Sequence, residues 1–258
     1  MNQAICIIPA RIGSKRVPKK NIRDFHGRPL LAWTILQAKS CLYVEDVYVT
    51  TDSEDAAKIA EEYGAKPLMR ESYIESLDAA SGGVPMVFAA KRIAKTRPLE
   101  TILALFATSP LRKPGDLDRM CARYFDLLEE MDGKSEGLSV SFMSPRYETF
   151  IARRMDNQYF KSEITDKTFT YMDLCGGASI SPASAYLSQV IELEDEKSWR
   201  DPVIFPKDET LRPYVPVEWW QCFEIDRQED FDICEYFFGA YLKDKWEEVC
   251  QGLLTKKK

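Results

Sequence analysis

Histidine is almost absent from this chain, which has one, His26, among 258 residues. A single histidine excludes a His-rich metal site. It also argues against a Ser-His or Cys-His catalytic arrangement, because His26 stands between Phe25 and Gly27 in a segment that is typical of a turn. We therefore expect His26 to have a structural role.

Closely spaced cysteine pairs are lacking too. The seven cysteines contain no CxxC pair and no metal-ligand spacing. An odd, scattered set is typical of reduced thiols in a reducing compartment. We therefore expect the cysteines to be free and the protein to be cytoplasmic.

The chain has neither a long apolar run nor an excess of positive charge. No stretch approaches the ~20 apolar residues of a membrane span, and the chain does not start with a basic-then-apolar signal. We expect no membrane association. The net charge of −6 argues against nucleic-acid binding, which needs a broad basic surface. Any anionic ligand is therefore expected to be small and bound by a local patch.

Strand and helix patterns alternate over the first two-thirds of the chain. Strands are predicted at 4–8, 46–50, 65–69, 101–106 and 137–143, and helices at 29–39, 54–63, 82–95 and 115–130. Such alternation predicts an α/β fold, a mainly parallel, doubly wound sheet with helices on both faces. The length suits one domain over 1–258.

The periodicity breaks between 144 and 174, which predicts a hairpin insertion or a dimerisation arm. Beyond it, the patterns predict a strand at 177–181, a short helix at 182–190 and a last strand at 221–225. Two helices, at 227–238 and 240–253, complete the expected elements.

The most informative segment is ICIIPARIGSKRVPKKN at 5–21, where a buried strand leads into a basic loop. Residues 11–28 contain seven Lys or Arg and a single acid, Asp24. The loop follows the carboxyl end of the first strand, where open α/β sheets bind ligands. Backbone N–H groups and cationic side chains can converge there on one polyanion, so we predict a phosphate site. The alternative is a solvated basic loop.

With this loop and the alternation established, the chain resembles the CMP-sialic acid synthetase (acylneuraminate cytidylyltransferase) family. The resemblance spans nearly the whole chain: IIPARIGSKRVPKKN at 7–21, GRPLLAWTI at 27–35, VYVTTDSEDAAKIAEEYGA at 47–65, TSPLR at 108–112, GGASIS at 176–181 and FEIDRQEDF at 223–231. It implies a nucleotide-diphospho-sugar transferase-like fold and a homodimer. It also implies CTP and a 3-deoxy-2-keto sugar acid as substrates, with Mg²⁺ as cofactor. CMP would pass to the anomeric hydroxyl and pyrophosphate would be released.

The resemblance also assigns roles within the basic loop. Arg11 and Lys15 match the phosphate ligands and would stabilise charge at the α-phosphate and the leaving pyrophosphate. Lys20 and Asn21 match positions that contact the triphosphate or the nucleoside, and Gly13 and Ser14 would supply backbone and hydroxyl donors to the nucleotide. Arg16 and Lys19 are expected to face solvent.

Asp226 is the strongest metal candidate. The family has Asp-x-Asp here, whereas this chain has Glu224-Ile225-Asp226. In a strand, residues two apart share a face, so both carboxylates could reach one Mg²⁺. The longer Glu224 could instead pair with a nearby base.

Other candidates follow later strands. Asp52 could contact the nucleotide or, like Ser53, cap the next helix. Arg70 matches the arginine near the base and ribose, and Asp78 matches an acidic position, with a spacing one residue longer. Ser109 and Arg112 follow the strand at 101–106 and are expected to face the same cleft, although Pro110 in a simple loop also explains TSPLR.

Two departures from the family concern the substrates. Phe106 stands where the family has Gln, and Gly176 where it has Asn. We expect Phe106 in the core and an altered sugar pocket, one that suits a modified sialic-acid analogue. Trp219 and Trp220 are expected to pack rather than wall the pocket. Two alternatives remain: a same-fold nucleotidyltransferase for another sugar or base, and a degenerate nucleotide-binding regulator.

Overall fold

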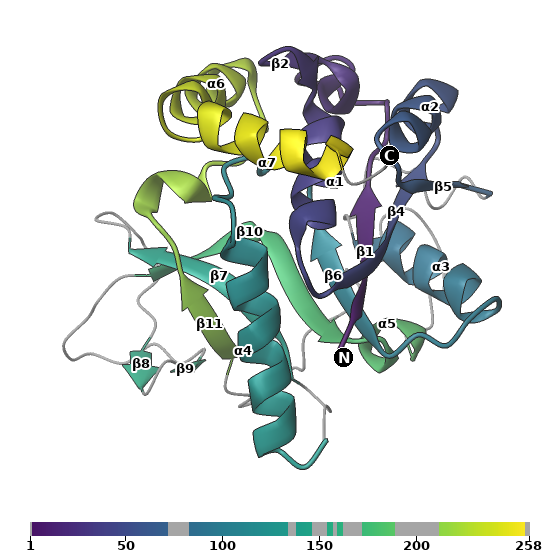
Figure 1. Ribbon diagram of the computed structural model, residues 1–258, viewed down its shortest axis with the longest axis vertical. Coiled ribbons are helices and arrows are strands. Elements are labelled where there is room, and N and C mark those ends of the chain that lie inside the picture. The colour runs from purple at the N-terminus through teal and green to yellow at the C-terminus, as the bar shows by residue number, and fades with distance from the viewer. Residues whose placement is uncertain are drawn as a thin grey trace.

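A computed structural model describes residues 2–71, 83–133, 138–145, 154–156, 159–161, 172–188 and 212–255. Within these residues, nine strands form one sheet in the order β5-β4-β1-β6-β10-β7-β11-β9-β8 (Figure 1). The strands are β1 (Ala4–Pro9), β4 (Val44–Thr51), β5 (Lys66–Met69), β6 (Thr101–Leu105), β7 (Val140–Pro145), β8 (Arg154–Asp156), β9 (Tyr159–Lys161), β10 (Met172–Pro182) and β11 (Arg212–Pro216).

The sheet is mainly parallel, as predicted. Strands β5, β4, β1 and β6 pair in parallel, and so do β7 and β11. Strand β10 runs antiparallel between β6 and β7. The short β8 and β9 pair with each other, antiparallel, within the stretch at 144–174. That this stretch is a dimerisation arm stays a prediction.

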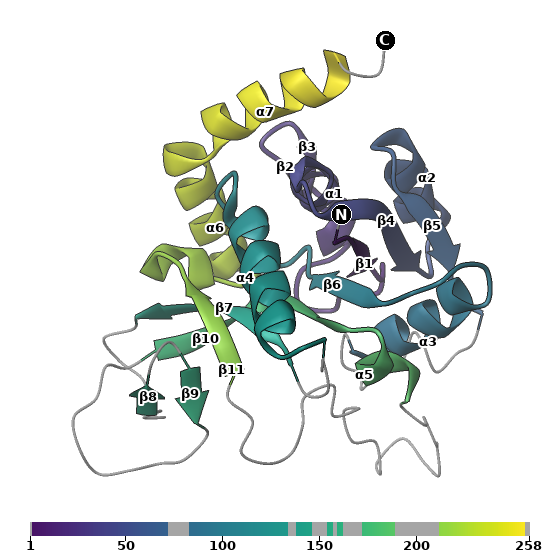
Figure 2. The same cartoon turned by 60° about the horizontal axis from the view of Figure 1, so that its bottom comes forward.

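Helices cover both faces of the sheet because alternate strand residues are buried on opposite sides. Cys6 and Ile8 pack with residues of α1 (Leu30–Ser40), α2 (Glu54–Glu62) and α4 (Asp116–Glu130). Ile5 and Ile7 pack with residues of α3 (Gly83–Ala94) and α5 (Ser184–Leu187). Figure 2 shows α3 and α5 on the side of β1 and β6 opposite to α1. The doubly wound architecture is confirmed.

A third cluster joins the two ends of the chain. Helices α6 (Gln228–Tyr241) and α7 (Lys243–Thr255) pack against α1 and the small hairpin of β2 (Asp24–Phe25) and β3 (Arg28–Pro29), which the sequence did not predict. His26 in this hairpin hydrogen-bonds through Nε2 to the Glu235 carbonyl (2.7 Å) and contacts the Phe238 ring. Its expected structural role is confirmed.

Two expectations are wrong. Residues 221–225 form no strand: a 3₁₀ turn, η3 (Trp219–Cys222), is followed by irregular chain, and the Ile225 N–H bonds to the Thr108 carbonyl of a loop rather than to a strand (2.7 Å). The thiols are not all free, because Cys222 is disulfide-bonded. Cysteine spacing carries no information on which thiols meet in space. Cys6, Cys41, Cys121, Cys234 and Cys250 are free.

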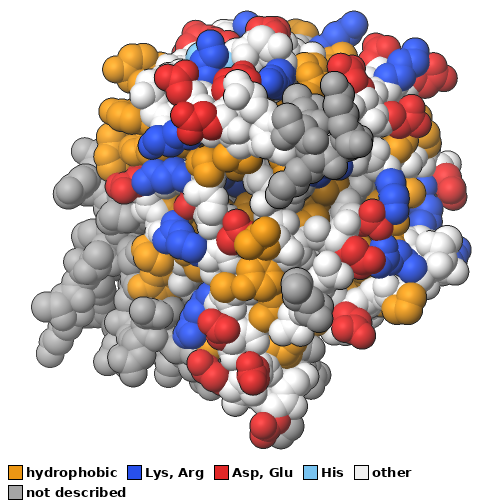
Figure 3. Space-filling view, in the orientation of Figure 1, with side chains coloured by type: hydrophobic (Ala, Val, Ile, Leu, Met, Phe, Trp, Pro, Cys, Tyr) orange, Lys and Arg blue, Asp and Glu red, His pale blue; other side chains and the backbone are white. Residues whose placement is uncertain are grey.

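Within the described residues, no helix is long and apolar enough to cross a membrane. On the face in Figure 3, acidic and basic side chains are interspersed rather than segregated.

Candidate functional site

The chain leaves β1, β4, β5 and β6 at one edge of the sheet, the carboxyl edge, because these four strands run parallel. The loop after β1 carries Arg11, Gly13, Ser14 and Lys15, all half-buried or exposed. A Cβ at Gly13 would have open space around it, so the loop has room beside its backbone for a ligand.

Two side chains hold this loop. The Asp52 carboxylate, just past β4, accepts from the Ile12 N–H (2.9 Å), while Ser53 caps α2 by accepting from Ala56 N (3.4 Å). Asn21 donates through Nδ2 to the Arg11 carbonyl (2.9 Å) and is buried. Asp52 therefore does not cap α2. Its carboxylate fixes the backbone of the loop after β1, and its contact with the nucleotide stays a prediction.

Lys20, in the 3₁₀ turn η1 (Lys20–Ile22), links the loop to the acidic segment at 224–226. It is 8% exposed, donates through Nζ to the Ile225 carbonyl and lies 3.9 Å from the Asp226 carboxylate. Burial lowers the pKa of Lys20, and the charge of Asp226 opposes this shift. Residues 205 positions apart in the sequence thus meet in one charged cluster.

The two acidic candidates lie on one side of the chain. Glu224 and Asp226 are exposed and Ile225 between them is buried, so the expected shared face is kept although the strand is not. Asp226 pairs with Arg16 (3.3 Å), which is exposed as expected. Glu224 accepts from the Ser109 hydroxyl (3.1 Å). Desolvation raises the pKa of Glu224, the Ser109 hydrogen bond opposes this, and nearby Asp226 adds to it.

This pair of carboxylates fits a Mg²⁺ ion that arrives with a triphosphate. Magnesium sites of nucleotide enzymes use one or two carboxylates together with phosphate oxygens and water. Among the residues that the structure describes, no group of three or more His, Cys, Asp or Glu could hold a metal by itself. The donor set therefore suits a shared site rather than a closed protein cage.

The expectation that Arg112 faces the cleft is wrong. Its side chain turns inward, where it donates to the carbonyls of Phe106 (2.8 Å) and Gly177 and to Gln37 Oε1 (2.8 Å). A loop that leaves a sheet has backbone carbonyls without strand partners, and a buried guanidinium supplies the donors that they need. Gln37 and Gly177 accept hydrogen bonds from Arg112 and so help to hold the loop after β6, a role that the sequence did not predict.

The remaining candidate residues differ in where the structure places them. Arg70, just past β5, donates to the Thr50 carbonyl at the same sheet edge (3.3 Å). Phe106 packs against the core cluster on the α3 face but is only half-buried, so its expected core position is met in part, and Gly176 lies in β10. Asp78 falls outside the described residues.

The tryptophan pair is only partly as expected. Trp220 is buried and stacks on Phe237 and Tyr241, whereas Trp219 is 49% exposed.

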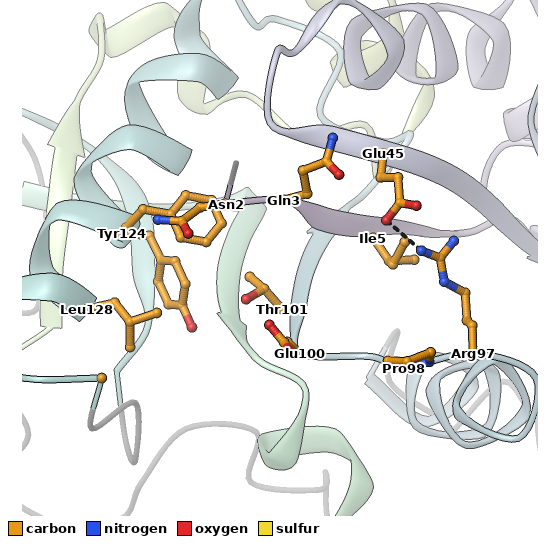
Figure 4. Close-up of a pocket in the computed structure, with 12 residues that line it drawn as sticks. Asn2, Gln3, Ile5, Glu45, Arg97, Pro98, Glu100, Thr101, Tyr124 and Leu128 are labelled. Carbon is orange, nitrogen blue, oxygen red and sulfur yellow. Dashed lines mark hydrogen bonds and ion pairs between the residues drawn. The ribbon is translucent and has the colours of Figure 1, made fainter.

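A hollow of about 480 Å³ lies at the opposite, amino edge of β1 and β6 (Figure 4). Its lining includes Gln3, Glu45, Arg97 and Tyr124. None of the predicted site residues that the structure describes lines it.

Comparison with known proteins agrees with this geometry. A family model described as "Cytidylyltransferase" matches residues 5–164. Pseudaminic acid cytidylyltransferase of Campylobacter jejuni is 28% identical over 197 residues, covering 72% of this chain and 81% of that protein. CMP-N,N'-diacetyllegionaminic acid synthase of Legionella pneumophila is 36% identical over 113 residues, covering 43% and 48%.

Solved structures support the fold. A CMP:2-keto-3-deoxy-manno-octonic acid synthetase complexed with CTP superposes with a TM-score of 0.66 at 16% identity, covering 93% of this chain and 100% of that one. A cytidylyltransferase from Leptospira borgpetersenii gives a TM-score of 0.56 at 16% identity, covering 100% and 95%. Sequence, fold and the charged sheet edge agree, and the chain belongs to the cytidylyltransferase family.

Proposed function

We propose that this protein transfers CMP from CTP to the anomeric hydroxyl of a sialic-acid-like 3-deoxy-2-keto sugar acid and releases pyrophosphate. The observation that carries the proposal is the junction of the β1 loop with segment 224–226, where buried Lys20 bonds to Ile225 and lies beside Asp226. Family membership and relatives named for pseudaminic and legionaminic acids support the substrate class.

The chain's own residues would position and neutralise the triphosphate. Arg11 and Lys15 would contact its phosphates, and Gly13 and Ser14 would offer backbone and hydroxyl donors. In the reaction, the anomeric hydroxyl loses its proton to solvent, its oxygen attacks the α-phosphorus, and the bond to the pyrophosphate oxygen breaks, so that pyrophosphate leaves. Fixed cationic side chains favour this step because negative charge builds on the leaving group.

Other residues would complete the nucleotide site. Lys20 would bring a desolvated positive charge close to the phosphates, and Asn21 would keep the Arg11 backbone in place. Arg70, Asp78 and Ser109 stay predicted nucleotide ligands.

Asp226 and Glu224 would hold Mg²⁺. When bound, the ion would supply positive charge to the phosphate oxygens. Both carboxylates face one side of the chain, and Ser109 already orients Glu224.

Phe106 and Gly176 lack the side-chain amides that the resemblance leads us to expect, so we propose that the sugar acid is a modified sialic-acid analogue. A homodimer formed through 144–174 and a cytoplasmic location are further predictions of the same resemblance.

The test is pyrophosphate release with Mg²⁺, each of the four nucleoside triphosphates and a panel of 3-deoxy-2-keto sugar acids. We expect release only when CTP and one sugar acid are both present. Asp226→Asn should lower kcat/KM about 100-fold, because charge neutralisation at the phosphates is lost. The matched control is Asp232→Asn on α6, an exposed acid whose removal should leave the rate unchanged.

Each other outcome has a definite meaning. Release with a different triphosphate would keep the reaction and overturn the choice of base. No release with any pair, with CTP still bound in calorimetry, would favour a nucleotide-binding regulator. A Mg²⁺ dependence that survives Asp226→Asn would refute the metal assignment.

A further inference from the structure

Arg112 is a cation buried beneath the site. Its residue is 3% exposed, and the three partners of its guanidinium are neutral: the Gln37 amide oxygen and the carbonyls of Phe106 and Gly177. Burial lowers the pKa of Arg112 to about 10. A buried charge with neutral partners costs free energy of folding. The segments that Arg112 joins therefore indicate what this costly burial stabilises.

Those segments enclose the loop after β6, residues 106–112. Phe106 opens the loop, Gly177 lies on the neighbouring β10, and Gln37 lies on α1. Other side chains hold the carbonyls at the end of the loop. Gln37 Nε2 donates to Pro110 (2.9 Å), Gln221 Nε2 to Leu111 (3.0 Å) and Trp246 Nε1 to Arg112 (2.8 Å).

Ser109 lies within this enclosed loop and faces the acidic segment. Its hydroxyl donates to Glu224 (3.1 Å), and the neighbouring Thr108 carbonyl accepts from the Ile225 N–H (2.7 Å). The loop also packs tightly on β10: a Cβ at Gly177 would lie 2.2 Å from the Ser109 Cβ and 3.2 Å from Arg112 Nη2. The place of Ser109, and through it that of segment 224–226, thus depends on how the loop closes onto β10.

We propose that Arg112 is a positioning residue: by closing loop 106–112 onto β10 and α1, it fixes the Ser109 hydroxyl against Glu224 and so places the acidic segment for catalysis. This inference rests on the proposed function, since it assigns to Glu224 and Asp226 a part in CMP transfer. Arg112 itself touches no reacting atom.

Arg112→Lys is the test variant, because it keeps a positive charge but loses the planar fork that reaches two carbonyls at once. We expect kcat for pyrophosphate release to fall about 10- to 100-fold, as for a misplaced catalytic group, and KM for CTP to rise by a smaller factor, since Ser109 is one of several predicted nucleotide ligands. Amide hydrogen exchange should accelerate in peptides covering 106–112 and 223–226 and stay unchanged in β1. A merely structural role would instead accelerate exchange throughout the core.

The matched control is Arg97→Lys. At the amino edge of the sheet, Arg97 pairs with Glu45 (Figure 4) and also with Asp46. Arg97→Lys should change neither kcat for pyrophosphate release nor amide hydrogen exchange at 106–112.

The double variant that combines Arg112→Lys with Ser109→Ala tests whether Arg112 acts through Ser109. If it does, the double variant should be no slower than the slower of the two single variants. Should Arg112→Lys fail to fold, Gln37→Met removes one partner of the same guanidinium, and the same local loss is expected.

The outcomes separate this inference from the proposed function. Wild-type rates and exchange in Arg112→Lys would overturn the positioning role and leave CMP transfer intact. Fully additive losses in the double variant would also overturn it. A wild-type protein that releases no pyrophosphate, while Arg112→Lys still loosens 106–112 and 223–226, would overturn the proposed function and keep the positioning of the segment.

Discussion

Lys20 shows how a single buried cation can serve both the fold and the chemistry. Its ammonium group bonds to the Ile225 carbonyl inside the protein and lies beside the exposed Asp226. Desolvation disfavours the charged form, so its pKa is lower than that of an ordinary lysine. At the residue scale, the site therefore contains a positive charge that is lost at a lower pH than the charge of surface lysines.

We predict an alkaline limb in the pH profile of kcat/KM for pyrophosphate release. As the pH rises through the lowered pKa of Lys20, the protonated fraction falls, and with it the stabilisation of the phosphates. Lys20→Arg should move this limb to higher pH, because arginine stays charged. Lys19→Arg, at an exposed neighbour, should leave it in place. An unchanged limb in Lys20→Arg would show that another group titrates.

At the scale of elements, the loop after β1 is held by its neighbours as well as by its own hydrogen bonds, such as that from the Ser14 N–H to the Ile12 carbonyl (2.8 Å). Asp52, at the end of β4, accepts from the Ile12 N–H, and Asn21 donates to the Arg11 carbonyl. The parallel pairing of β1 and β4 brings Asp52 within reach of a residue 40 positions earlier. The loop is thus preorganised, which lowers the entropy that a triphosphate must overcome to bind.

We predict that Asp52→Ala weakens CTP binding about tenfold in calorimetry, the equivalent of one hydrogen bond to a charged acceptor. Asp52→Asn keeps an acceptor oxygen and should retain most of the affinity. Asp55→Ala, at an exposed position in the first turn of α2, should bind CTP like the wild type. Equal affinities in Asp52→Ala and the wild type would mean that the loop needs no tether.

At the scale of the whole molecule, the C-terminal helices α6 and α7 stabilise the site by packing against the apolar residues of its loops. The cluster formed by α6 and α7 includes Val17 of the β1 loop, Leu111 of loop 106–112 and Ile225 of the acidic segment. All three site loops thus share one apolar layer with Trp246, which is 1% exposed. Loss of that layer should disturb the site and the global stability together.

We predict that Trp246→Ala lowers the free energy of unfolding by about 3–5 kcal/mol, the usual cost of removing a buried tryptophan side chain. Trp246→Phe keeps a ring but loses the bond to the Arg112 carbonyl and should cost less. Trp219→Ala, at a half-exposed position, is the control and should cost least. Urea unfolding measures all three, and equal midpoints would show that the C-terminal helices are not part of the core.

Prediction from the sequence worked where burial has a local period. Strand residues such as Ile5 and Cys6 alternate between two apolar faces, and the helices between the strands carry their own apolar stripes. It failed at 221–225, because an apolar alternation without a neighbouring strand cannot form a sheet. It also missed β11 (Arg212–Pro216), where two prolines in five residues argue against a strand. The β2–β3 hairpin was missed because its two-residue strands are too short to show a period.

The sequence alone determined the α/β class, the basic loop at the end of the first strand and the candidates Arg11, Lys15, Glu224 and Asp226, because each depends on local pattern or motif. Only the tertiary structure decided what these residues meet. Arg112 turns inward because Phe106 and Gly177 present carbonyls there, and Asp52 binds Ile12 because two strands lie side by side. The partner of a polar group is set by what lies opposite it in space, and for partners as far apart in the sequence as Asp52 and Ile12 no sequence period records that.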